Sequence, residues 1–344
     1  MTVLVLSHAQ DLHATQVLAA LASRGRPAFL FDLATLPDRA SLTLDYADPG
    51  HPVATVRPDG AAPVVLTDAT AVWWRRPQYP RLDMISDPDA LAFTHGEWHE
   101  ALYGLYELID CPWMNEPPRD DRASRKALQL RVATRLGLRV PDTLMTSDPD
   151  DARRFVERHG LGNVIYKIFT ATQQVWRQTR LVQPADVVDL DALRLAPVIF
   201  QEYVRAVADV RVIVVGRRTF PMAIHTRGTS YEVDFRVSIS EARTEPIELP
   251  PEVEIRLRHL MAHFGLAYGA IDLRLTDDGD WVFLEVNPAG EFLFCETGAG
   301  FPITEAVADW LADPATDGGP SCQSTGRTST VSSRSSSFGR RSTG

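Results

Sequence analysis

The sequence predicts a mixed α/β (α+β) protein in which a small parallel α/β domain precedes a larger domain rich in strands. Three observations indicate this class. The start of the chain carries strand, helix and strand patterns in turn. Many short apolar segments between residues 164 and 225 are bounded by Gly, Pro, Asn or Asp, as antiparallel strands are. Finally, 344 residues are too many for one ordinary core, so we expect about two domains.

The N-terminal domain is predicted to span residues 1–117. Residues 2–6 form an apolar strand, residues 11–23 have the leucine and valine spacing of a helix, and "PAFLFDL" is a second strand. "AVWWRRP" is predicted to be a later strand of the same sheet, followed by a long helix over residues 88–109. Prolines in "NEPPRDD" then break the pattern, which places the domain boundary near residues 115–120.

The second domain is predicted to span residues 118–315, with a central subdomain at about residues 140–204 and a C-terminal subdomain at about 205–315. Asp120 and Asp121 are expected to cap its first helix. Its strands are expected at "NVIYKIF", "QQVWRQTRLV", "PVIFQEYV", "DVRVIVVG" and "TFPMAIHT", and its later helices at residues 149–159, 250–264 and 303–311.

Composition limits the classes of function. A formal net charge of -10 argues against a general nucleic-acid surface, and no apolar stretch approaches the length of a membrane span. The odd set of three cysteines, Cys111, Cys295 and Cys322, fits a reducing cytoplasm. The tail at residues 316–344 is rich in Ser, Thr and Arg and poor in apolar side chains, so we expect it to be disordered.

Oxygen-donor side chains gather in "AIDLRLTDDGDWVFLEVNPAGEF". We expect Asp272 at the end of one strand, and the "DDGD" turn brings back a second strand that carries Glu285. Asn287 lies two residues after Glu285 and points to the same side. Two carboxylates and an amide suit a hard cation such as Mg²⁺, although a solvated polar face remains the alternative from spacing alone.

Two lysines indicate an anion near this end. Lys167 interrupts the apolar strand "VIYKIF", where a buried ammonium is costly unless it meets an anion such as a nucleotide phosphate, and Lys126 lies on the first helix of the second domain. We expect adenine to lie across the backbone of residues 202–204 and Asp209 to bind ribose hydroxyls. The predicted nucleotide-binding set is Lys126, Lys167, Gln201, Glu202, Tyr203, Val204 and Asp209.

These motifs, in this order, resemble the ATP-grasp superfamily and, within it, the RimK-like ligases. The resemblance covers about residues 1–312 and runs through "YKIF", "QEYV", "DVRVIVVG", "AIDLR" and "LEVNPAGEF". It implies an ATP-grasp fold with an N-terminal pre-ATP-grasp domain. One departure is "KIFTATQQVW", where many relatives have a glycine-rich phosphate loop; Thr170 and Thr172 are expected to replace some of its backbone donors.

Finer features resemble the graspetide, or microviridin-type, peptide maturases, and high usage of Arg and Ala fits an actinobacterial branch. The features are "WMNEP", "DFR" and "NPAGEFLFCETGAGFPITEAVADWL". The resemblance implies a cytoplasmic macrocyclase, expected to be a homodimer, whose partner is a ribosomal precursor peptide made of a leader and a core. It would use ATP and Mg²⁺, with two ions expected and Mn²⁺ as a substitute.

The implied reaction forms an acyl phosphate from a peptide carboxylate and ATP, and a hydroxyl or amine then displaces phosphate. Arg211 and Arg274 are the candidates to bind the acyl phosphate. Arg236, with Asp234 beside it in an extended segment, is the candidate to hold the carboxylate that reacts, although the two residues also fit a surface ion pair. His225 is a weaker candidate as proton acceptor, and a structural role fits it better.

Three other functions remain open from the residues. A RimK-like ligase would join free amino acids or extend a peptide terminus; a non-catalytic ATP-binding module and a small-molecule kinase are the others. An adjacent reading frame with repeated Thr or Ser and Asp or Glu would favour the macrocyclase.

Three further motifs have simpler interpretations. His95 and His99 are four apart on a helix, but "HGEWHE" lacks the HExxH order of zinc proteases, so we expect a polar helix face. "WWRRP" is expected to serve domain packing rather than peptide contact. Cys295, near the predicted metal end, is expected to be a small packed residue.

Overall fold

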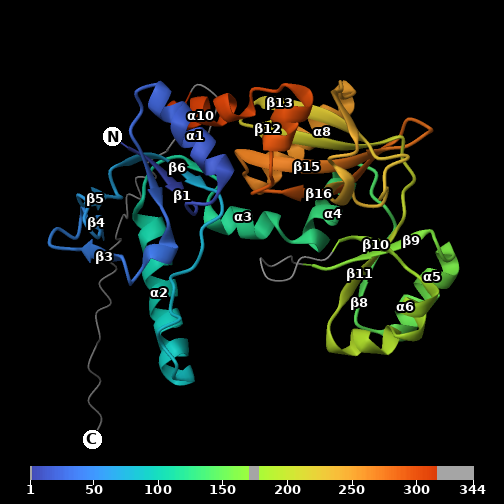
Figure 1. The fold of residues 1–344 in the computed structure, drawn as a ribbon, viewed down its shortest axis with the longest axis horizontal. Coiled ribbons are helices and arrows are strands. Elements are labelled where there is room, and N and C mark those ends of the chain that lie inside the picture. Colours follow the sequence, from blue (N-terminus) through green and yellow to red (C-terminus); the bar gives the residue numbers. More distant parts are fainter. Residues whose placement is uncertain (1, 170–177, 316–344) are drawn as a thin grey trace, which may run out of the picture.

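The computed structural model describes residues 2–169 and 178–315 and consists of three parts (Figure 1). Thr170 and Thr172, Cys322 and the predicted tail therefore lie outside the described residues. No helix in the described part of the chain is both long enough and apolar enough to cross a bilayer.

The N-terminal part is built on a parallel sheet with strand order β2-β1-β6-β7. Its register places β1 between β2 and β6, as the strand, helix, strand pattern predicted. Its elements are β1 (Thr2–Leu6), α1 (Leu12–Ser23), β2 (Ala28–Phe31), β6 (Ala69–Trp74), α2 (Pro88–Leu108) and β7 (Trp113–Met114). A small antiparallel sheet of β3 (Ala40–Asp45), β4 (Val53–Pro58) and β5 (Val64–Val65), which the patterns did not reveal, packs beside it.

Two short helices lead from this part into the second domain: α3 (Pro117–Ala123) and α4 (Lys126–Arg135). The predicted capping by Asp120 and Asp121 was wrong, because both residues lie within α3. Glu116 is the N-cap of α3 and Pro117 starts it, as a proline at the first helical position favours. Helix α4 instead begins at Lys126, so this lysine lies at a helix N-terminus.

The central part is an antiparallel sheet with strand order β10-β9-β11-β8, covered by helices on one side (Figure 1). Its elements are β8 (Thr143–Thr146), α5 (Pro149–His159), β9 (Val164–Lys167), β10 (Arg180–Leu181), α6 (Pro184–Val188) and β11 (Val198–Glu202). Of the strand predicted at "QQVWRQTRLV", residues 180 and 181 form β10, and residues 173–177 lie outside the described ranges.

The C-terminal part is a five-stranded antiparallel sheet, order β14-β13-β12-β15-β16, with helices on both faces. Its strands are β12 (Ala208–Val215), β13 (Arg218–His225), β14 (Arg243–Pro246), β15 (Tyr268–Leu275) and β16 (Trp281–Asn287); its helices are α7 (Phe235–Ser238), α8 (Pro251–Phe264), α9 (Leu293–Ala299) and α10 (Ile303–Ala312). The prediction that Asp272 ends its strand was wrong, since β15 continues to Leu275. Pairing with the fully buried β12 extends over the whole of β15.

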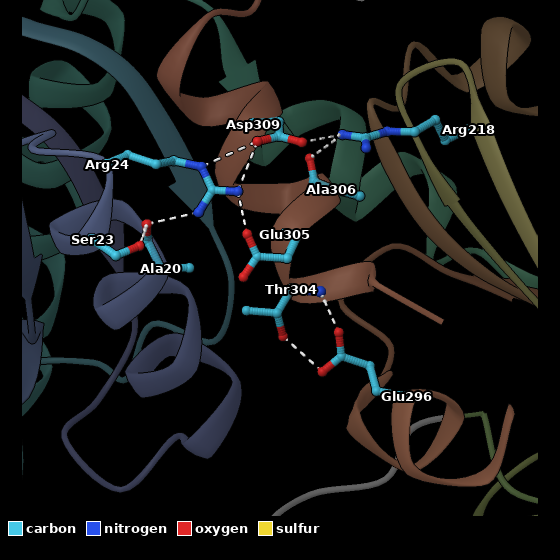
Figure 2. Close-up of polar contacts among 9 residues, drawn as sticks. All are labelled: Ala20, Ser23, Arg24, Arg218, Glu296, Thr304, Glu305, Ala306 and Asp309. Atoms are coloured by element: carbon cyan, nitrogen blue, oxygen red, sulfur yellow. Dashed lines mark hydrogen bonds and ion pairs between the residues drawn. The ribbon is translucent and has the colours of Figure 1, made fainter. Parts of the chain in front are cut away.

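Helix α10 packs between the N-terminal domain and the C-terminal sheet. It packs against α1 through buried apolar side chains, and Arg24 of α1 forms ion pairs with Glu305 and Asp309 of α10 (Figures 1 and 2). Arg218 of β13 reaches the same Asp309, with 3.2 Å between its Nη2 and the Oδ2 of the aspartate. The N-terminal domain is therefore held against the C-terminal sheet.

Candidate functional site

A cavity that is partly open to solvent collects most of the predicted site residues. Its walls come from α4, β9, β11, β12, α7, β15 and β16, so it lies between the central and C-terminal sheets. The predicted residues that line it are Lys126, Lys167, Gln201, Glu202, Tyr203, Val204, Asp209, Asp234, Arg236, Asp272, Arg274 and Glu285. Arg211 and Asn287 are not among its lining residues.

The two predicted metal carboxylates face each other across β15 and β16. Asp272 is the register partner of Glu285, and a bulge follows immediately, so that Leu273 pairs with Phe283. Burial raises the pKa of Asp272 to about 6, opposed by Arg211. Burial also acts to raise the pKa of Glu285, but Lys126 and Lys167 outweigh it and hold that pKa well below its usual range. Glu285 is therefore charged at neutral pH.

Besides Arg211, three cations lie around this carboxylate pair, and one of them, Arg236, is itself paired with Asp234. Lys126 forms an ion pair with Glu285, and both side chains are mostly buried. Burial lowers the pKa of Lys167, with the charge of Lys126 adding to the effect. Arg236 is close enough to both carboxylates that their charges help to raise its pKa. Because cations outnumber carboxylates at this end of the cavity, an added anion would be stabilised there.

The predicted adenine-binding segment lies at the end of β11, on the wall of the cavity. The main-chain N–H of Glu202 donates to Asp142 O and that of Tyr203 to Asn163 O, which fixes the segment to its neighbours. The carbonyl of Val204 accepts a hydrogen bond from Arg274 Nη1 at 2.7 Å. The segment is thus a rigid edge on one side of the cavity.

Asp209 and Arg274 have contacts that differ from their predicted roles. Arg274 Nε donates to Asp209 Oδ1 at 2.8 Å, and both side chains are 6% exposed. Arg274 Nη2 also donates to the carbonyls of Glu232 and Val233, and Thr226 donates to the other carboxylate oxygen of Asp209. Since each charge already neutralises the other, the arrangement argues against Asp209 binding ribose and against Arg274 binding an acyl phosphate.

Asp234 and Arg236 form a close pair, but not on the extended segment that was predicted. Asp234 is the N-cap of the short helix α7, and its Oδ2 also accepts the main-chain N–H of Thr179 at 3.1 Å. Arg236 Nη2 lies 2.6 Å from Asp234 Oδ2. The side chain of Arg236 lines the cavity and is 43% exposed, and its Nε and Nη2 both donate to Asp234.

The structure places Arg211, Asn287 and His225 away from the cavity lining. Arg211 Nη1 lies 3.2 Å from Asp272 Oδ1, and its guanidinium lies over the rings of Phe235 and Phe294. Arg211 therefore holds Asp272 in position and does not itself line the ligand cavity. His225 instead pairs with Glu245 on β14, which argues against its predicted role as proton acceptor.

The donor set fits a hard cation. In the described part of the chain no group of three His, Cys, Asp or Glu residues is placed to hold a metal. The predicted ligands differ from such a group, because they are two carboxylates and the amide of Asn287. Asp272 Oδ1 is buried and accepts no hydrogen bond from any described residue. An unsatisfied carboxylate oxygen opposite a second carboxylate suits Mg²⁺, which binds few protein oxygens and keeps water and phosphate as its other ligands.

Sequence reasoning missed the apolar side chains that complete the cavity. These are Ile165, Ile168, Phe169, Val233, Phe235 and Leu284. Strand alternation could have revealed Ile165, because it is two residues from Lys167 on β9 and shares its face. Leu284 was not accessible to this reasoning, since it faces the cavity only because of the bulge opposite Asp272.

The three simpler interpretations agree with the structure. His95 and His99 lie on the exposed part of α2. Trp73 is buried in the core that joins β6 to α10. Cys295 is fully buried, and burial raises the pKa of its thiol to about 12.

Comparison with protein families matches nearly the whole of the described chain. Residues 2–121 match the MvdD pre-ATP grasp domain, and residues 123–311 match the RimK-like ATP-grasp domain.

Two solved structures extend the similarity. The macrocyclase MdnC from Microcystis aeruginosa MRC, bound with precursor peptide MdnA, has a TM-score of 0.81 and 30% identity, covering 91% of this chain and 100% of that one. The ATP-grasp ligase PsnB, complexed with minimal precursor, Mg and ADP, has a TM-score of 0.73 and 26% identity, covering 90% and 96%.

One curated relative carries the name of a glutamate ligase. The probable alpha-L-glutamate ligase of Citrobacter koseri is 27% identical over 276 residues, covering 78% of this chain and 89% of that protein. Since the RimK-like model alone matches more than half of the chain, this protein belongs to the RimK-like ATP-grasp family of ADP-forming ligases, and carries an N-terminal pre-ATP-grasp domain.

Proposed function

We propose that this protein closes ω-ester or ω-amide links in a ribosomally made precursor peptide. It would join Asp or Glu side chains to Ser, Thr or Lys side chains at the expense of ATP. The observation that carries the proposal is the similarity to MdnC, a macrocyclase bound with its precursor peptide, over 91% of this chain. The match to an MvdD pre-ATP grasp domain adds support, because it covers the part of the chain outside the RimK-like domain.

The chemistry proceeds in two steps. A carboxylate oxygen of the peptide attacks the γ-phosphorus of ATP, and the bond from this phosphorus to the β,γ-bridging oxygen breaks. The products are ADP and an acyl phosphate on the peptide. The hydroxyl or amine of the acceptor then attacks the acyl carbon, loses its proton and displaces inorganic phosphate. Neither step needs a nucleophile from the protein, so positioning and charge stabilisation are its main contributions.

We assign the phosphates of ATP to the cationic end of the cavity. Lys167, on β9, and Lys126, at the N-terminus of α4, would bind them, because these ammonium groups are desolvated and gain most from an added anion. Adenine would lie against the edge formed by Glu202, Tyr203 and Val204.

We assign the reacting carboxylate of the peptide to Arg236. Its side chain lines the cavity and is oriented by Asp234, whose other contacts hold it at the start of α7. A bidentate contact from a preoriented arginine would restrict the carboxylate to one direction of approach. Arg211 would act indirectly, by holding Asp272.

Asp272, Glu285 and Asn287 would hold magnesium, with two ions expected and Mn²⁺ as a substitute. When bound, the metal would neutralise phosphate charge and align the transfer. For the metal to bind, Lys126 would exchange its contact with Glu285 for one with phosphate. We also infer a cytoplasmic homodimer, which the mass of the purified protein in solution would check.

The second candidate is a RimK-like ligase that adds free glutamate to a protein or peptide. The similarity to the probable alpha-L-glutamate ligase of Citrobacter koseri favours it, because the two chains share 27% identity over most of their lengths.

A single assay separates the two candidates. The protein is incubated with the peptide of an adjacent reading frame that repeats Thr or Ser and Asp or Glu, together with ATP, Mg²⁺ and free glutamate, and the mass of the peptide is measured by mass spectrometry. The proposal requires the loss of one water per ring and formation of one ADP. A peptide that gains the mass of a glutamate residue, with no peptide lighter by one water, would establish the second candidate instead.

A further inference from the structure

The loop that follows the predicted metal ligands is held by the N-terminal domain. Three consecutive main-chain carbonyls come directly after Asn287, and buried side chains bind all of them. Asn115 Nδ2 donates to Pro288 O at 3.2 Å. Arg75 Nη1 donates to Ala289 O and, at 2.9 Å, to Gly290 O.

Arg75 is one of the most deeply buried charges in the molecule. It is 1% exposed, and its Nε lies 3.3 Å from Asp11 Oδ2. Asp11 is oriented in turn by Ser7, whose hydroxyl donates to Oδ2 at 2.7 Å. Well-packed apolar side chains would hold two domains together at least as well as a buried ion pair, so interface stability alone does not explain this arginine. Its Nη1 instead contacts two adjacent carbonyls of the loop, while its Nε lies beside Asp11, so one rigid planar group ties the loop to the N-terminal domain.

Asn115 connects the same loop to the strand that carries Asp272. Its Oδ1 accepts the N–H groups of Ala267 and Tyr268, at 2.8 and 3.0 Å, and its Nδ2 donates to Tyr268 O as well as Pro288 O. One buried amide thus fixes the start of β15 relative to the end of β16. The hydroxyl of Tyr268 adds a 2.8 Å bond to Gly290 O.

The loop cannot relax easily within this arrangement. A Cβ added at Gly290 would lie 2.3 Å from the Cβ of Ala270. The loop also sets the orientation of Asn287, whose Oδ1 accepts the N–H of Ala289 at 3.0 Å and whose carbonyl accepts the N–H of Gly290. The position of the Asn287 side chain is therefore coupled to the contacts of Arg75 and Asn115.

We propose that Arg75 and Asn115 are positioning residues for the metal end of the site, acting from the pre-ATP-grasp domain through the carbonyls of residues 288–290. This inference rests on the proposed metal ligands Asp272, Glu285 and Asn287. The N-terminal domain would then set the affinity for the metal as well as completing the fold, because partners that orient ligands commonly change metal affinity by about 10–100-fold.

The test compares variants in Mg²⁺-dependent binding of ADP, measured by calorimetry, which needs no peptide. Arg75→Lys keeps the buried charge but replaces the planar guanidinium, which reaches Asp11 and the loop at once, by one ammonium on a shorter side chain. Asn115→Ser removes the contact with Pro288. In each folded variant, we expect the Mg²⁺ concentration for half-maximal ADP binding to rise about tenfold. Binding of ADP without Mg²⁺ should change less than about twofold.

Two reference variants make the outcomes distinct. Arg24→Ala breaks a different contact between the domains and should leave the Mg²⁺ requirement unchanged, whereas Glu285→Gln should raise it. If Glu285→Gln raises it and neither Arg75→Lys nor Asn115→Ser does, the positioning proposal is overturned. If Glu285→Gln has no effect either, the proposed metal site is wrong. If Arg75→Lys does not fold, Asn115→Ser alone decides, since it leaves the charge pair intact.

Discussion

The cavity and the contact between the N-terminal domain and loop 288–290 both bury charged side chains, but they use them differently. In the cavity, Lys126 and Arg236 are paired with Glu285 and Asp234 but line an open space together with Lys167, and the buried Oδ1 of Asp272 accepts no hydrogen bond from the described residues. At the loop, Arg75 already faces a carboxylate and two carbonyls. The difference lies in the surroundings, since the cavity charges line a space that a ligand can enter, whereas Arg75 is enclosed by protein and its partners are all groups of the chain.

The comparison predicts its largest effect at Glu285. Glu285→Gln removes the charged ligand between two lysines while preserving shape, so turnover should fall by about 100-fold or more, as when a group that stabilises transition-state charge is lost. The rate of ADP formation and the thermal unfolding midpoint measure the two properties separately. Full activity in a folded variant would show that the metal binds elsewhere.

A smaller effect is expected at Lys167. Lys167→Met should weaken ATP binding by about 10–100-fold, because it removes a charged hydrogen bond to phosphate. It should not destabilise the fold, since a buried charge is replaced by an apolar side chain of similar length. Titration calorimetry with ATP measures the affinity. Arg180→Met, on the neighbouring strand but outside the cavity lining, is the matched control, and equal losses in both variants would argue against a specific phosphate contact.

At the loop, the effect is on packing. Gly290→Ala should lower the free energy of unfolding by about 1–3 kcal/mol, because its Cβ would meet Ala270. Gly104→Ala, in α2, has open space around the added carbon and should raise stability by about 0.5–1 kcal/mol. Urea unfolding measures both. The same sign for the two variants would contradict the close packing inferred at the loop.

The smallest effect is expected at the contact between α1 and α10. Arg24→Ala removes ion pairs with Glu305 and Asp309, whose side chains are about half exposed (Figure 2). Such pairs contribute roughly 0.2–1 kcal/mol, and salt screens them. Unfolding at low and high ionic strength checks this, and a loss that persists undiminished in high salt would indicate packing rather than charge.

Much of the fold could be predicted from local pattern. Helices α5, α8 and α10 and the strands that carry Lys167, Glu202 and Asp272 were identified, because alternation and helical spacing report burial directly. The sheet of β3, β4 and β5 was missed, although "ASLTLD" in β3 alternates between more buried and more exposed residues and this period of two could have revealed the strand.

The sequence predicted which residues form the site better than it predicted their contacts. Most candidates chosen by residue type and order line one cavity. The pairing of Asp209 with Arg274, however, depends on register between β12 and β15, and residue spacing along one strand does not specify the partner on another. Arg75 and Asn115 were not recognised as part of the site because they lie more than 150 residues before the loop they bind.

The proposed function requires that ATP activates a side-chain carboxylate of the peptide. A precursor whose core Asp and Glu carboxyl groups carry ¹⁸O reports on this step. If an acyl phosphate forms and is displaced, one ¹⁸O per ring will appear in the released inorganic phosphate, alongside ADP and a peptide lighter by one labelled water. Ring closure with unlabelled phosphate, or ADP release without any ring, would contradict the account.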